Sequence, residues 1–363
     1  MHQILITGVT GFVGSALAAN FLARGARVLA VSRNDPDGMR TINAVVAAAQ
    51  GSGLDIHGVL ANHLDVVNVD FSYLEDVLDD AKLAGVTEVW HVAAEMSYSP
   101  RKLSQSFATN VGNTSRLYEL LSRNAPDCRR FYYVSTAYVV GMEGGLVKEE
   151  LHACSHMINT YQTTKWSAEH SLHLLFHRHG LPVTLFRPSI VVGHSRSGWA
   201  LRNGFGFYMF PCSMVAAAQA GLKELAVDLV ADSHLDCIAI DQLAADACAL
   251  TLREQQGRDF EVFHCAGGNG ARLEELVHMW GEVAGLRAVL GTPTSALELK
   301  FNRAVEPNRP FANQIWQFDR SLLDAATERS TPLSPLSLEA LRTMCLWYAD
   351  DVAAEQAAMA EVN

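Results

Sequence analysis

The sequence predicts a doubly wound α/β fold, in which helices cover both faces of a parallel sheet. Strand-like and helix-like segments alternate from Gln3 to Phe186. The strand-like segments are near-continuous apolar runs, such as Val28-Leu29-Ala30-Val31, which a sheet buried on both faces requires. The chain has 363 residues, of which 49% are hydrophobic and 18% charged, so it can bury a large core. These observations together favour the layered α/β architecture.

The boundary of each element is expected where the spacing of apolar residues changes between that of a strand and that of a helix. Strands are expected at Gln3–Thr7, Ala26–Ser32, His63–Asp70, Val86–Val92, Arg130–Ser135 and Pro182–Phe186. Helices are expected at Phe12–Ala23, Met39–Gln50, Tyr73–Leu83, Leu103–Arg123 and Tyr161–His179. After Gly193 the alternation is replaced by a segment rich in glycine and aromatic residues.

The change of pattern after Gly193 predicts a division of the chain into a sheet domain and a smaller lobe. Residues 1–193 are expected to form the sheet domain. Residues 233–265 are expected to return to its sheet, through strands at Leu235–Ile240 and Glu261–Cys265 and a helix that begins at Asp241. Residues 194–232 and 266–363 are then expected to form the lobe, which would bind a substrate.

Composition and charge exclude several classes of protein. The 28 basic and 39 acidic residues give a formal net charge of −11 without a long basic cluster, so neither nucleic acid nor a membrane surface is an expected partner. The most apolar run, from Phe207 to Ala218, is interrupted by Pro211 and is too short to span a bilayer. No secretion signal precedes the first strand, which predicts a cytoplasmic protein.

The cysteines and histidines do not indicate a metal centre. The seven cysteines are scattered without a C-x-x-C pair and are expected to be reduced thiols. Four histidines that fall close together are expected on the surface of a helix: His170, His173, His177 and His179. Because no spacing typical of metal ligands occurs, the sequence predicts no bound metal.

A glycine-rich turn follows the first strand and precedes the first helix. It places glycines at Gly8, Gly11 and Gly14, in the pattern G-x-x-G-x-x-G. Glycines at such a turn let the backbone approach a pyrophosphate, and the following helix offers free N–H groups to it. The expected dinucleotide-binding residues here are Gly8, Thr10, Gly11, Phe12, Val13 and Gly14. The turn therefore predicts a Rossmann-type dinucleotide site.

The end of the second strand predicts the choice of nicotinamide cofactor. An acidic side chain at this place binds the ribose 2′-hydroxyl of NAD and repels a 2′-phosphate. Ser32 stands there instead and Arg33 follows, which gives a hydroxyl and a planar cation suited to phosphate, with Arg40 as a further candidate. The alternative is an ordinary surface arginine paired with Asp35 or Asp37. The sequence favours NADPH.

A Tyr-x-x-x-Lys spacing occurs at Tyr161 and Lys165. Residues four apart share one face of a helix, so the Lys165 ammonium is expected near the Tyr161 phenol. The positive charge would lower the pKa of the phenol from its usual value of about 10 and allow proton exchange near neutral pH. This pair is the predicted catalytic centre.

With these motifs in their order along the chain, the sequence resembles the extended short-chain dehydrogenases/reductases. Besides the glycine turn, the matching positions are Asp70 and Phe71 at the adenine, Ala93 and Ala94 after the fourth strand, Asn110, Thr136 within Ser135-Thr136-Ala137-Tyr138-Val139, Tyr161, Lys165, and Pro188 and Ser189 at the nicotinamide. The resemblance covers residues 4 to 193. It implies that Tyr161 donates a proton and that Thr136 donates a hydrogen bond. It also implies that Lys165 holds the nicotinamide ribose and that Asn110 positions a water.

Within this family the chain looks like the thioester reductase and fatty acyl-CoA reductase branch. The segments that carry this likeness are Ser135–Val139, Tyr161–Glu169 and Gly193–Trp199, while Ala239-Ile240-Asp241 departs from the branch's usual Pro-Val-Asp. The branch reduces acyl thioesters with NADPH to an aldehyde or an alcohol. The alternatives are a carbonyl reductase for ketones or aldehydes, a sugar-nucleotide epimerase or dehydratase with the same tetrad, and a redox-sensing or scaffold protein of the same fold.

The lobe and the loop after the fourth strand supply candidates for substrate binding. Residues Trp199 to Phe210, with Met96 and Tyr98, are expected to wall an apolar acyl pocket, or else to pack the lobe. Four basic residues are candidates for contact with a phosphopantetheine or CoA phosphate, with ordinary exposed side chains as the more common alternative: Arg101, Lys102, Arg196 and Arg202. An acyl or peptidyl carrier protein is a candidate partner, and the helices Leu103–Arg123 and Tyr161–His179 are candidates for a homodimer interface.

Overall fold

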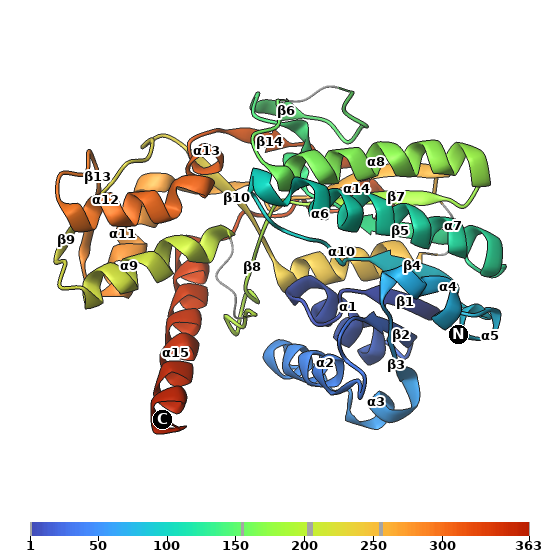
Figure 1. Cartoon of the computed structure of the whole chain (residues 1–363). Coiled ribbons are helices and arrows are strands. Elements are labelled where there is room, and N and C mark those ends of the chain that lie inside the picture. Colours follow the sequence, from blue (N-terminus) through green and yellow to red (C-terminus); the bar gives the residue numbers. More distant parts are fainter. Residues whose placement is uncertain (1, 154–155, 202–205, 254–256, 363) are drawn as a thin grey trace.

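A seven-stranded parallel sheet forms the centre of the larger part of the protein. The computed structural model describes residues 2–153, 156–201, 206–253 and 257–362 (Figure 1). Across the sheet the strands are β11 (Phe260–Cys265), β7 (Val183–Pro188), β5 (Arg130–Val134), β4 (Glu88–His91), β1 (Gln3–Thr7), β2 (Arg27–Ser32) and β3 (Leu64–Asn68). All neighbouring pairs are parallel, and the direction of winding reverses between β1 and β4. The predicted doubly wound α/β fold is therefore confirmed.

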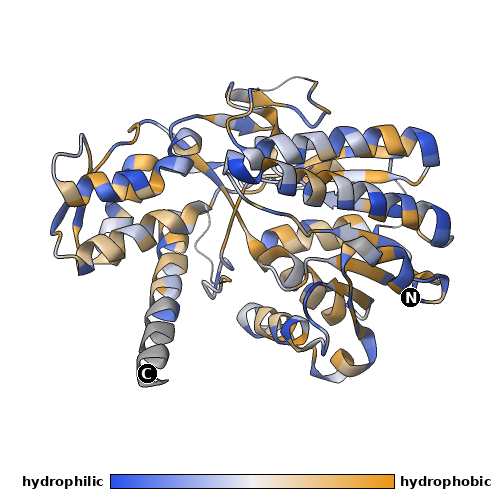
Figure 2. Ribbon diagram, viewed as in Figure 1, coloured by the Kyte–Doolittle hydropathy of each residue, from blue (hydrophilic) through white to orange (hydrophobic). Residues whose placement is uncertain are grey.

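Helices cover both faces of this sheet. One face packs against α1 (Phe12–Ala23), α2 (Met39–Ser52) and α10 (Ile240–Leu252), around a core that includes Ile4, Trp90 and Phe186. The other face packs against α7 (Thr114–Asn124) and α8 (Thr160–His179). Figure 2 shows apolar colour concentrated on the central strands and hydrophilic colour on the outward sides of α7 and α8. Among the described helices, none is long and apolar enough to cross a membrane.

Two expected helices differ from the structure, and one helix was not expected. A short helix, α3 (His57–His63), precedes β3. The helix expected at Tyr73–Leu83 is broken into short turns, α4 (Leu74–Val77) and α5 (Asp80–Leu83), because the Asp79 side chain accepts a hydrogen bond from the Lys82 N–H and starts a new helix. The helix expected at Leu103–Arg123 contains α6 (Leu103–Phe107), a π-helical turn at Ala108–Asn113, and α7.

A smaller lobe follows β7 along the chain. Its strands are β8 (Ile190–Val192), β10 (His234–Ala239) and β12 (Asn269–Arg272) in one sheet, and β9 (Glu224–Val227) with β13 (Arg287–Leu290) in another. Its helices are α9 (Met209–Gln219), α11 (Leu273–Ala284), α12 (Ala296–Val305), α13 (Arg309–Ala312) and α15 (Leu338–Val362). The pair β6 (Gly145–Val147) and β14 (Trp316–Phe318) lies beside the main sheet (Figure 1).

The return of residues 233–265 to the main sheet is only partly as predicted. β11 joins the sheet beside β7, and α10 packs on its face. β10, however, pairs with β8 and β12 in the lobe. The reason is that β11 occupies the free edge of β7, whereas β8 leaves the main sheet after Ser189 and offers β10 a parallel partner.

The segment after β8 returns toward the main sheet and contacts α2. The Ser197 hydroxyl donates a hydrogen bond to the Gly51 carbonyl at 2.5 Å, and the Trp199 ring lies against Gly51. A Cβ atom on Gly51 would lie 2.1 Å from the Trp199 ring, so this position has room only for glycine. The Trp199 ring centre is also 5.3 Å from that of Phe12 at the start of α1. Trp199 therefore joins the lobe to the glycine turn.

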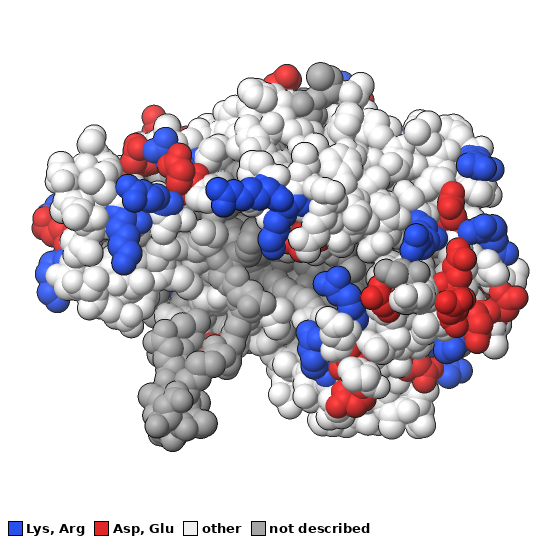
Figure 3. Space-filling view, viewed as in Figure 1, with Lys and Arg blue, Asp and Glu red and all other residues white. Residues whose placement is uncertain are grey.

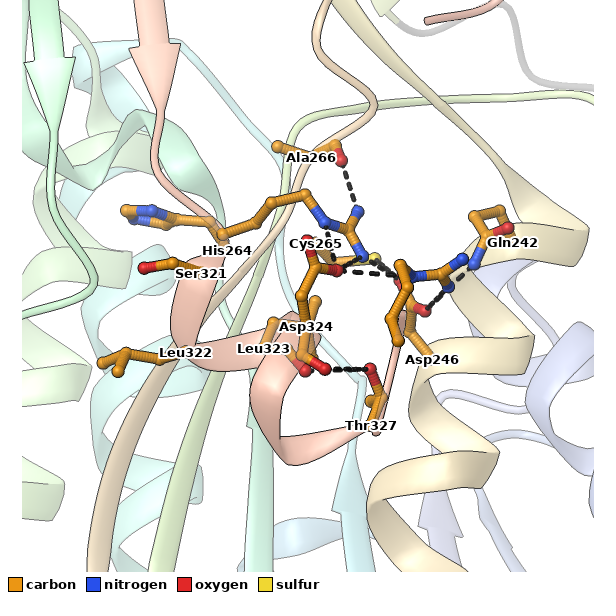
Figure 4. A network of polar contacts seen from close by, with 12 residues as sticks. Gln242, Asp246, His264, Cys265, Ala266, Ser321, Leu322, Leu323, Asp324 and Thr327 are labelled. Atoms are coloured by element: carbon orange, nitrogen blue, oxygen red, sulfur yellow. Dashed lines mark hydrogen bonds and ion pairs between the residues drawn. The ribbon is translucent and has the colours of Figure 1, made fainter. Parts of the chain in front are cut away.

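A buried carboxylate ties residues 320–329 to the main sheet (Figure 4). Asp246 on α10 accepts hydrogen bonds from Arg320 at 3.1 Å and from Arg329 at 2.6 Å. Arg320 also binds Asp324, on α14 (Ser321–Ala326), and donates to the Ala266 carbonyl at 2.6 Å. Asp246 is 1% exposed. Its carboxylate therefore holds α10, the end of β11 and α14 together.

Candidate active site

A cavity of about 620 Å³ opens at the carboxyl edge of the sheet, between the main sheet and the lobe. The reversal of winding between β1 and β4 places a crevice at this edge, which is where open α/β sheets bind ligands. Figure 3 shows the molecule hollowed in this region, with basic side chains on both sides of the hollow. Among the described residues, no group of three potential metal ligands occurs.

The glycine turn forms one wall of this cavity. The lining residues from the turn are Gly8, Thr10, Gly11, Phe12, Val13 and Gly14. The Gly11 N–H donates to the Gly8 carbonyl at 3.0 Å, and a Cβ atom on Gly14 would lie 2.2 Å from the Gly8 oxygen. This close approach explains the spacing of the two glycines. α1 begins directly after the turn without a side-chain cap, so its first N–H groups face an anion-binding position.

The end of β2 carries the residues expected at the 2′-phosphate. Ser32, Arg33 and Arg40 line the cavity. The buried Asp35 carboxylate accepts hydrogen bonds from the Thr41 hydroxyl at 2.6 Å and from the Arg40 N–H at 3.0 Å. Burial acts to raise the pKa of Asp35, but these hydrogen bonds outweigh it and lower the pKa below its usual value. The Asp35 carboxylate therefore binds the first turn of α2. Arg33 forms no ion pair with any described residue.

The remaining expected cofactor residues divide into two groups. Those that line the cavity are Phe71, Ala93, Ala94, Lys165, Pro188 and Ser189. Asp70, by contrast, is exposed and lies outside the cavity walls. Its carbonyl accepts a hydrogen bond from the Tyr73 N–H, so the chain turns there and presents Phe71 to the cavity instead.

The catalytic candidates Tyr161, Lys165 and Thr136 all line the cavity. The Lys165 Nζ donates a hydrogen bond to the Val134 carbonyl at 2.6 Å and lies 6.0 Å from the centre of the Tyr161 ring. The Thr136 hydroxyl oxygen accepts from the Tyr138 N–H at 3.3 Å, which leaves its own proton available as a donor. α8 and the end of β5 thus bring three proton-donating groups to one wall.

The ionisation of this centre differs from the expectation that Lys165 lowers the pKa of Tyr161. Burial raises the pKa of the Tyr161 phenol well above 10, and Tyr98 adds to the effect. Burial also lowers the pKa of Lys165 to about 7, with Glu169 acting in the opposite direction. The low-dielectric surroundings of both groups therefore outweigh their mutual attraction.

Asn110 is buried behind the cavity wall. Its Oδ1 accepts from the Glu95 N–H at 2.7 Å, and its Nδ2 donates to the Glu95 carbonyl and to the Thr164 hydroxyl, both at 2.9 Å. These contacts join the π-helical turn, the loop after β4 and α8. The positioning of a water by Asn110 stays a prediction.

A chain of hydrogen bonds that the sequence did not reveal runs beside this wall. The Thr114 hydroxyl donates to the Asn110 carbonyl at 2.7 Å, so it accepts at 2.9 Å from Nε2 of His91. Nδ1 of His91 then accepts from the Thr7 hydroxyl at 2.7 Å. Burial lowers the pKa of His91 to about 3, with Lys165 adding to the effect, so the ring is neutral. No motif or spacing of charged residues around His91 in the sequence would have identified this role.

The lobe side of the cavity is mainly apolar. Its walls are Met96, Tyr98, Tyr138, Ile190, Leu201, Phe207, Tyr208, Phe210, Leu235, Asn308, Phe311 and Ala312. Met96 and Tyr98 were expected here, but Trp199 packs against Gly51 instead, and residues 202–205 lie outside the described part of the chain. Asn308 and Phe311 were not expected, because they arrive from a distant part of the sequence through the packing of the lobe.

The arginines and lysine expected at a pantetheine phosphate do not line this cavity. Arg101, Lys102 and Arg196 are exposed outside its walls. Arg202 lies outside the described residues.

The sequence is similar to one family model and to parts of larger known proteins. The family model described as male sterility protein matches residues 6–246. A carboxylic acid reductase of Segniliparus rugosus is 26% identical over 301 residues, which cover 76% of this chain and 25% of the reductase. A hybrid PKS-NRPS synthetase of Penicillium oxalicum is 28% identical over 197 residues, which cover 53% of this chain and 4% of the synthetase. The matched region is thus a small part of these relatives.

Solved structures share the fold. The terminal R domain from the myxalamid PKS-NRPS biosynthetic pathway has a TM-score of 0.73 and 20% identity, over 98% of this chain and 91% of that domain. A UDP-glucuronic acid 4-epimerase from Bacillus cereus, in complex with NAD, has a TM-score of 0.66 and 19% identity, over 96% of this chain and 99% of the epimerase. Because the family model matches residues 6–246, which is more than half of the sequence, the chain belongs to the male sterility protein family.

Proposed function

We propose that this protein uses NADPH to reduce an acyl thioester to an aldehyde or alcohol. The observation that carries the proposal is a single cavity with a dinucleotide-type glycine turn at one end and apolar walls at the other. Tyr161, Lys165 and Thr136 lie between these two parts. A carbonyl group bound in the apolar part would meet the proton donors of the protein at the place where a nicotinamide would be held.

The residues present fit a nicotinamide dinucleotide. Gly14 lets the start of α1 pack closely against the glycine turn, since a Cβ atom there would collide with the Gly8 carbonyl, and this packing is typical of a dinucleotide-binding turn. Arg33 lines the cavity next to Ser32 and has no carboxylate partner among the described residues, which supports NADPH over NADH. The reduced nicotinamide supplies a hydride to the carbonyl carbon.

The side chains of the protein would donate the proton and stabilise the negative charge that develops on the carbonyl oxygen. Tyr161, which stays a protonated phenol at neutral pH, gives its proton to the carbonyl oxygen while Thr136 donates a hydrogen bond to it. The product is a hemithioacetal. Its hydroxyl returns a proton to Tyr161 as the carbon–sulfur bond breaks, the aldehyde carbonyl forms again, and the thiolate leaves and takes a proton from water. The raised pKa of Tyr161 keeps the phenol protonated, which is the form that donates a proton during reduction.

The alternative of a sugar-nucleotide epimerase is less well supported. A nucleotide sugar carries a pyrophosphate, which proteins bind with arginine, lysine or backbone N–H groups. In the described part of the chain, no arginine or lysine lines the lobe side of the cavity. Apolar walls suit an acyl chain better. A carbonyl reductase for ketones or aldehydes would use the same walls, and thiol release separates it from a thioester reductase.

The delivery of the acyl group and the assembly of the protein belong to this proposal as well. Two of the similar proteins, the Penicillium oxalicum synthetase and the myxalamid R domain, come from PKS-NRPS systems, which supports an acyl group on a carrier protein, with CoA as the other source. A homodimer through α7 and α8 and a cytoplasmic location stay predictions.

The deciding assay follows NADPH absorbance and free thiol together. The purified chain is given NADPH with acyl-pantetheine thioesters, acyl-CoAs, matching aldehydes and UDP-sugars in separate reactions. NADPH oxidation with one thiol released for each aldehyde formed is the expected result. Turnover with ketones or aldehydes alone would replace the proposal with a carbonyl reductase, and conversion of UDP-sugars without net NADPH oxidation would replace it with an epimerase.

Arg33→Ala tests the choice of cofactor. We expect it to weaken NADPH binding about 10- to 100-fold, because it removes a charged hydrogen bond to the 2′-phosphate, and to leave NADH binding nearly unchanged. Fluorescence titration with each cofactor measures both affinities. Arg287→Ala, which removes an exposed arginine paired with Glu224 in the lobe, is the matched control. An equal loss of NADH and NADPH affinity in the Arg33 variant would remove the phosphate assignment.

A further inference from the structure

Two fully buried charged side chains lie behind the catalytic wall. Glu169 on α8 and Arg187 on β7 are each 0% exposed. The Arg187 Nε donates to Glu169 Oε1 at 2.9 Å and the Nη2 donates to Oε2 at 2.5 Å. This two-point arrangement fixes the orientation of both groups, because the planar guanidinium matches the carboxylate.

The pair connects the two elements that carry the site. Glu169 follows Lys165 by four residues on α8, so both side chains lie on the same face of the helix. Arg187 directly precedes Pro188 and Ser189, which line the cavity. A shift of α8 along β7 would break both hydrogen bonds of the pair. The pair therefore holds Lys165 in register with the cavity edge.

The titratable groups around Arg187 and Glu169 are mostly uncharged. The Arg187 Nη1 donates to the Glu150 carbonyl at 2.9 Å and lies 3.5 Å from Nε2 of His264. Burial lowers the pKa of His264 to about 3 and also lowers the pKa of His152, with Arg187 adding to both effects. Burial raises the pKa of Glu149, which accepts from the His264 N–H, to about 7.

The groups around Lys165 itself are also neutral. Burial raises the pKa of Tyr133, whose ring centre lies 4.6 Å from the Lys165 Nζ, and of Tyr161. The His91 ring stays neutral for the reason given above. Glu169 is therefore the carboxylate that opposes the loss of charge that burial imposes on Lys165.

We propose that Glu169, oriented by Arg187, is a positioning residue that keeps the Lys165 ammonium charged and in place beside Tyr161. The part of this inference that concerns catalysis rests on the proposed function, whereas the charge state of Lys165 does not. Glu169 acts only through Lys165, since it lies outside the cavity walls.

Glu169→Gln removes the charge and keeps nearly the same shape. Because the opposite charge of Glu169 favours the charged form of Lys165, the variant lowers the pKa of Lys165 by about one unit or more. Lysine is charged below its pKa and loses its charge as the pH rises. The fall of kcat/KM for thioester reduction at high pH therefore moves to lower pH in the variant. A role confined to stability would lower the amount of folded enzyme without moving this limb.

The charge of Lys165 can be read without any substrate. NMR of protein labelled with ¹³C at the lysine ε-carbon follows each ammonium through its titration. The chain has six lysines, Lys82, Lys102, Lys148, Lys165, Lys223 and Lys300, so the spectrum is simple. Lys165→Met assigns the signal of Lys165 by its disappearance.

Glu261→Gln is the matched control for this experiment. Glu261 on β11 is also a buried carboxylate, paired with Arg130 at 3.1 Å and Arg253 at 2.6 Å. Arg130 begins β5, whereas Val134, which Lys165 contacts, ends it. The control thus breaks a similar ion pair at the amino-terminal end of the strands, away from Lys165, and leaves the Lys165 titration unchanged.

A second variant covers the case in which Glu169→Gln does not fold. Glu169→Gln with Arg187→Met removes both charges, so no unpaired arginine is left in the core. A lower pKa for Lys165 in either folded variant supports the proposal, and an unchanged Lys165 titration overturns it. If the titration shifts but the wild-type protein reduces no thioester, the proposed function fails and the assignment of Glu169 to the charge of Lys165 stands.

Discussion

Tyr161→Phe lowers the rate of thioester reduction by about 10²- to 10⁴-fold, the range that a positioned general acid contributes. The change removes one hydroxyl from the cavity wall and keeps the ring. Lys165 retains its hydrogen bond to the Val134 carbonyl, so the wall that would hold the nicotinamide ribose is preserved. NADPH affinity is therefore expected to change little. Single-turnover rates and a fluorescence titration of NADPH measure the two quantities separately.

Tyr118→Phe provides the control for this substitution. Tyr118 on α7 is buried outside the cavity walls, and its hydroxyl donates to the Leu181 carbonyl at 2.6 Å. Losing that hydroxyl costs about 1 kcal/mol of stability and leaves the rate unchanged. If Tyr161→Phe weakened NADPH binding and preserved the rate, Tyr161 would be a cofactor contact and the proton donor would have to be another group.

Asp246→Ala is expected to have the largest effect on stability. It leaves Arg320 and Arg329 in a partly buried site without the carboxylate that both of them bind. Removing one partner of a buried ion pair costs about 3–5 kcal/mol. α14 and the chain that leads into α15 would also lose their connection to α10. Urea unfolding followed by tryptophan fluorescence measures the loss as a lower midpoint.

Asp65→Ala is the comparison for Asp246. Asp65 forms an exposed ion pair with Arg27 at 3.6 Å on the edge of the same sheet, and such pairs contribute less than about 1 kcal/mol. Equal unfolding midpoints for the two variants would mean that the Asp246 carboxylate does not hold residues 320–329 to the sheet.

Local sequence was sufficient for elements whose ends are set by nearby residues. β1 and α1 occur at the expected residues, because the glycine turn between them ends one and begins the other. The placement of Tyr161 and Thr136 at one cavity also followed from local information, since Thr136 follows the end of β5 and Tyr161 lies in the first turn of α8. The α/β layering was predicted from apolar runs such as Val28-Leu29-Ala30-Val31, which are also local features of the sequence.

Features that depend on distant contacts could not be predicted in this way. The strand β10 was expected, but its place in the lobe depends on β11 having taken the edge of β7. Phe311 reaches the cavity only because the lobe packs α13 against the loop that carries Tyr98. The raised pKa of Tyr161 depends on how deeply the folded protein buries it, and no spacing in the sequence measures that depth.

The contact between Trp199 and Gly51 limits how this protein can vary through evolution. α2 would tolerate many residues at position 51 if it were isolated, and alanine is a better helix former there than glycine. With the indole in place, any side chain at this position would overlap it. Substitutions at the two positions are therefore coupled, because a larger residue at 51 requires a smaller ring at 199. In related chains these two positions are expected to change as a pair, although 148 positions separate them in the sequence.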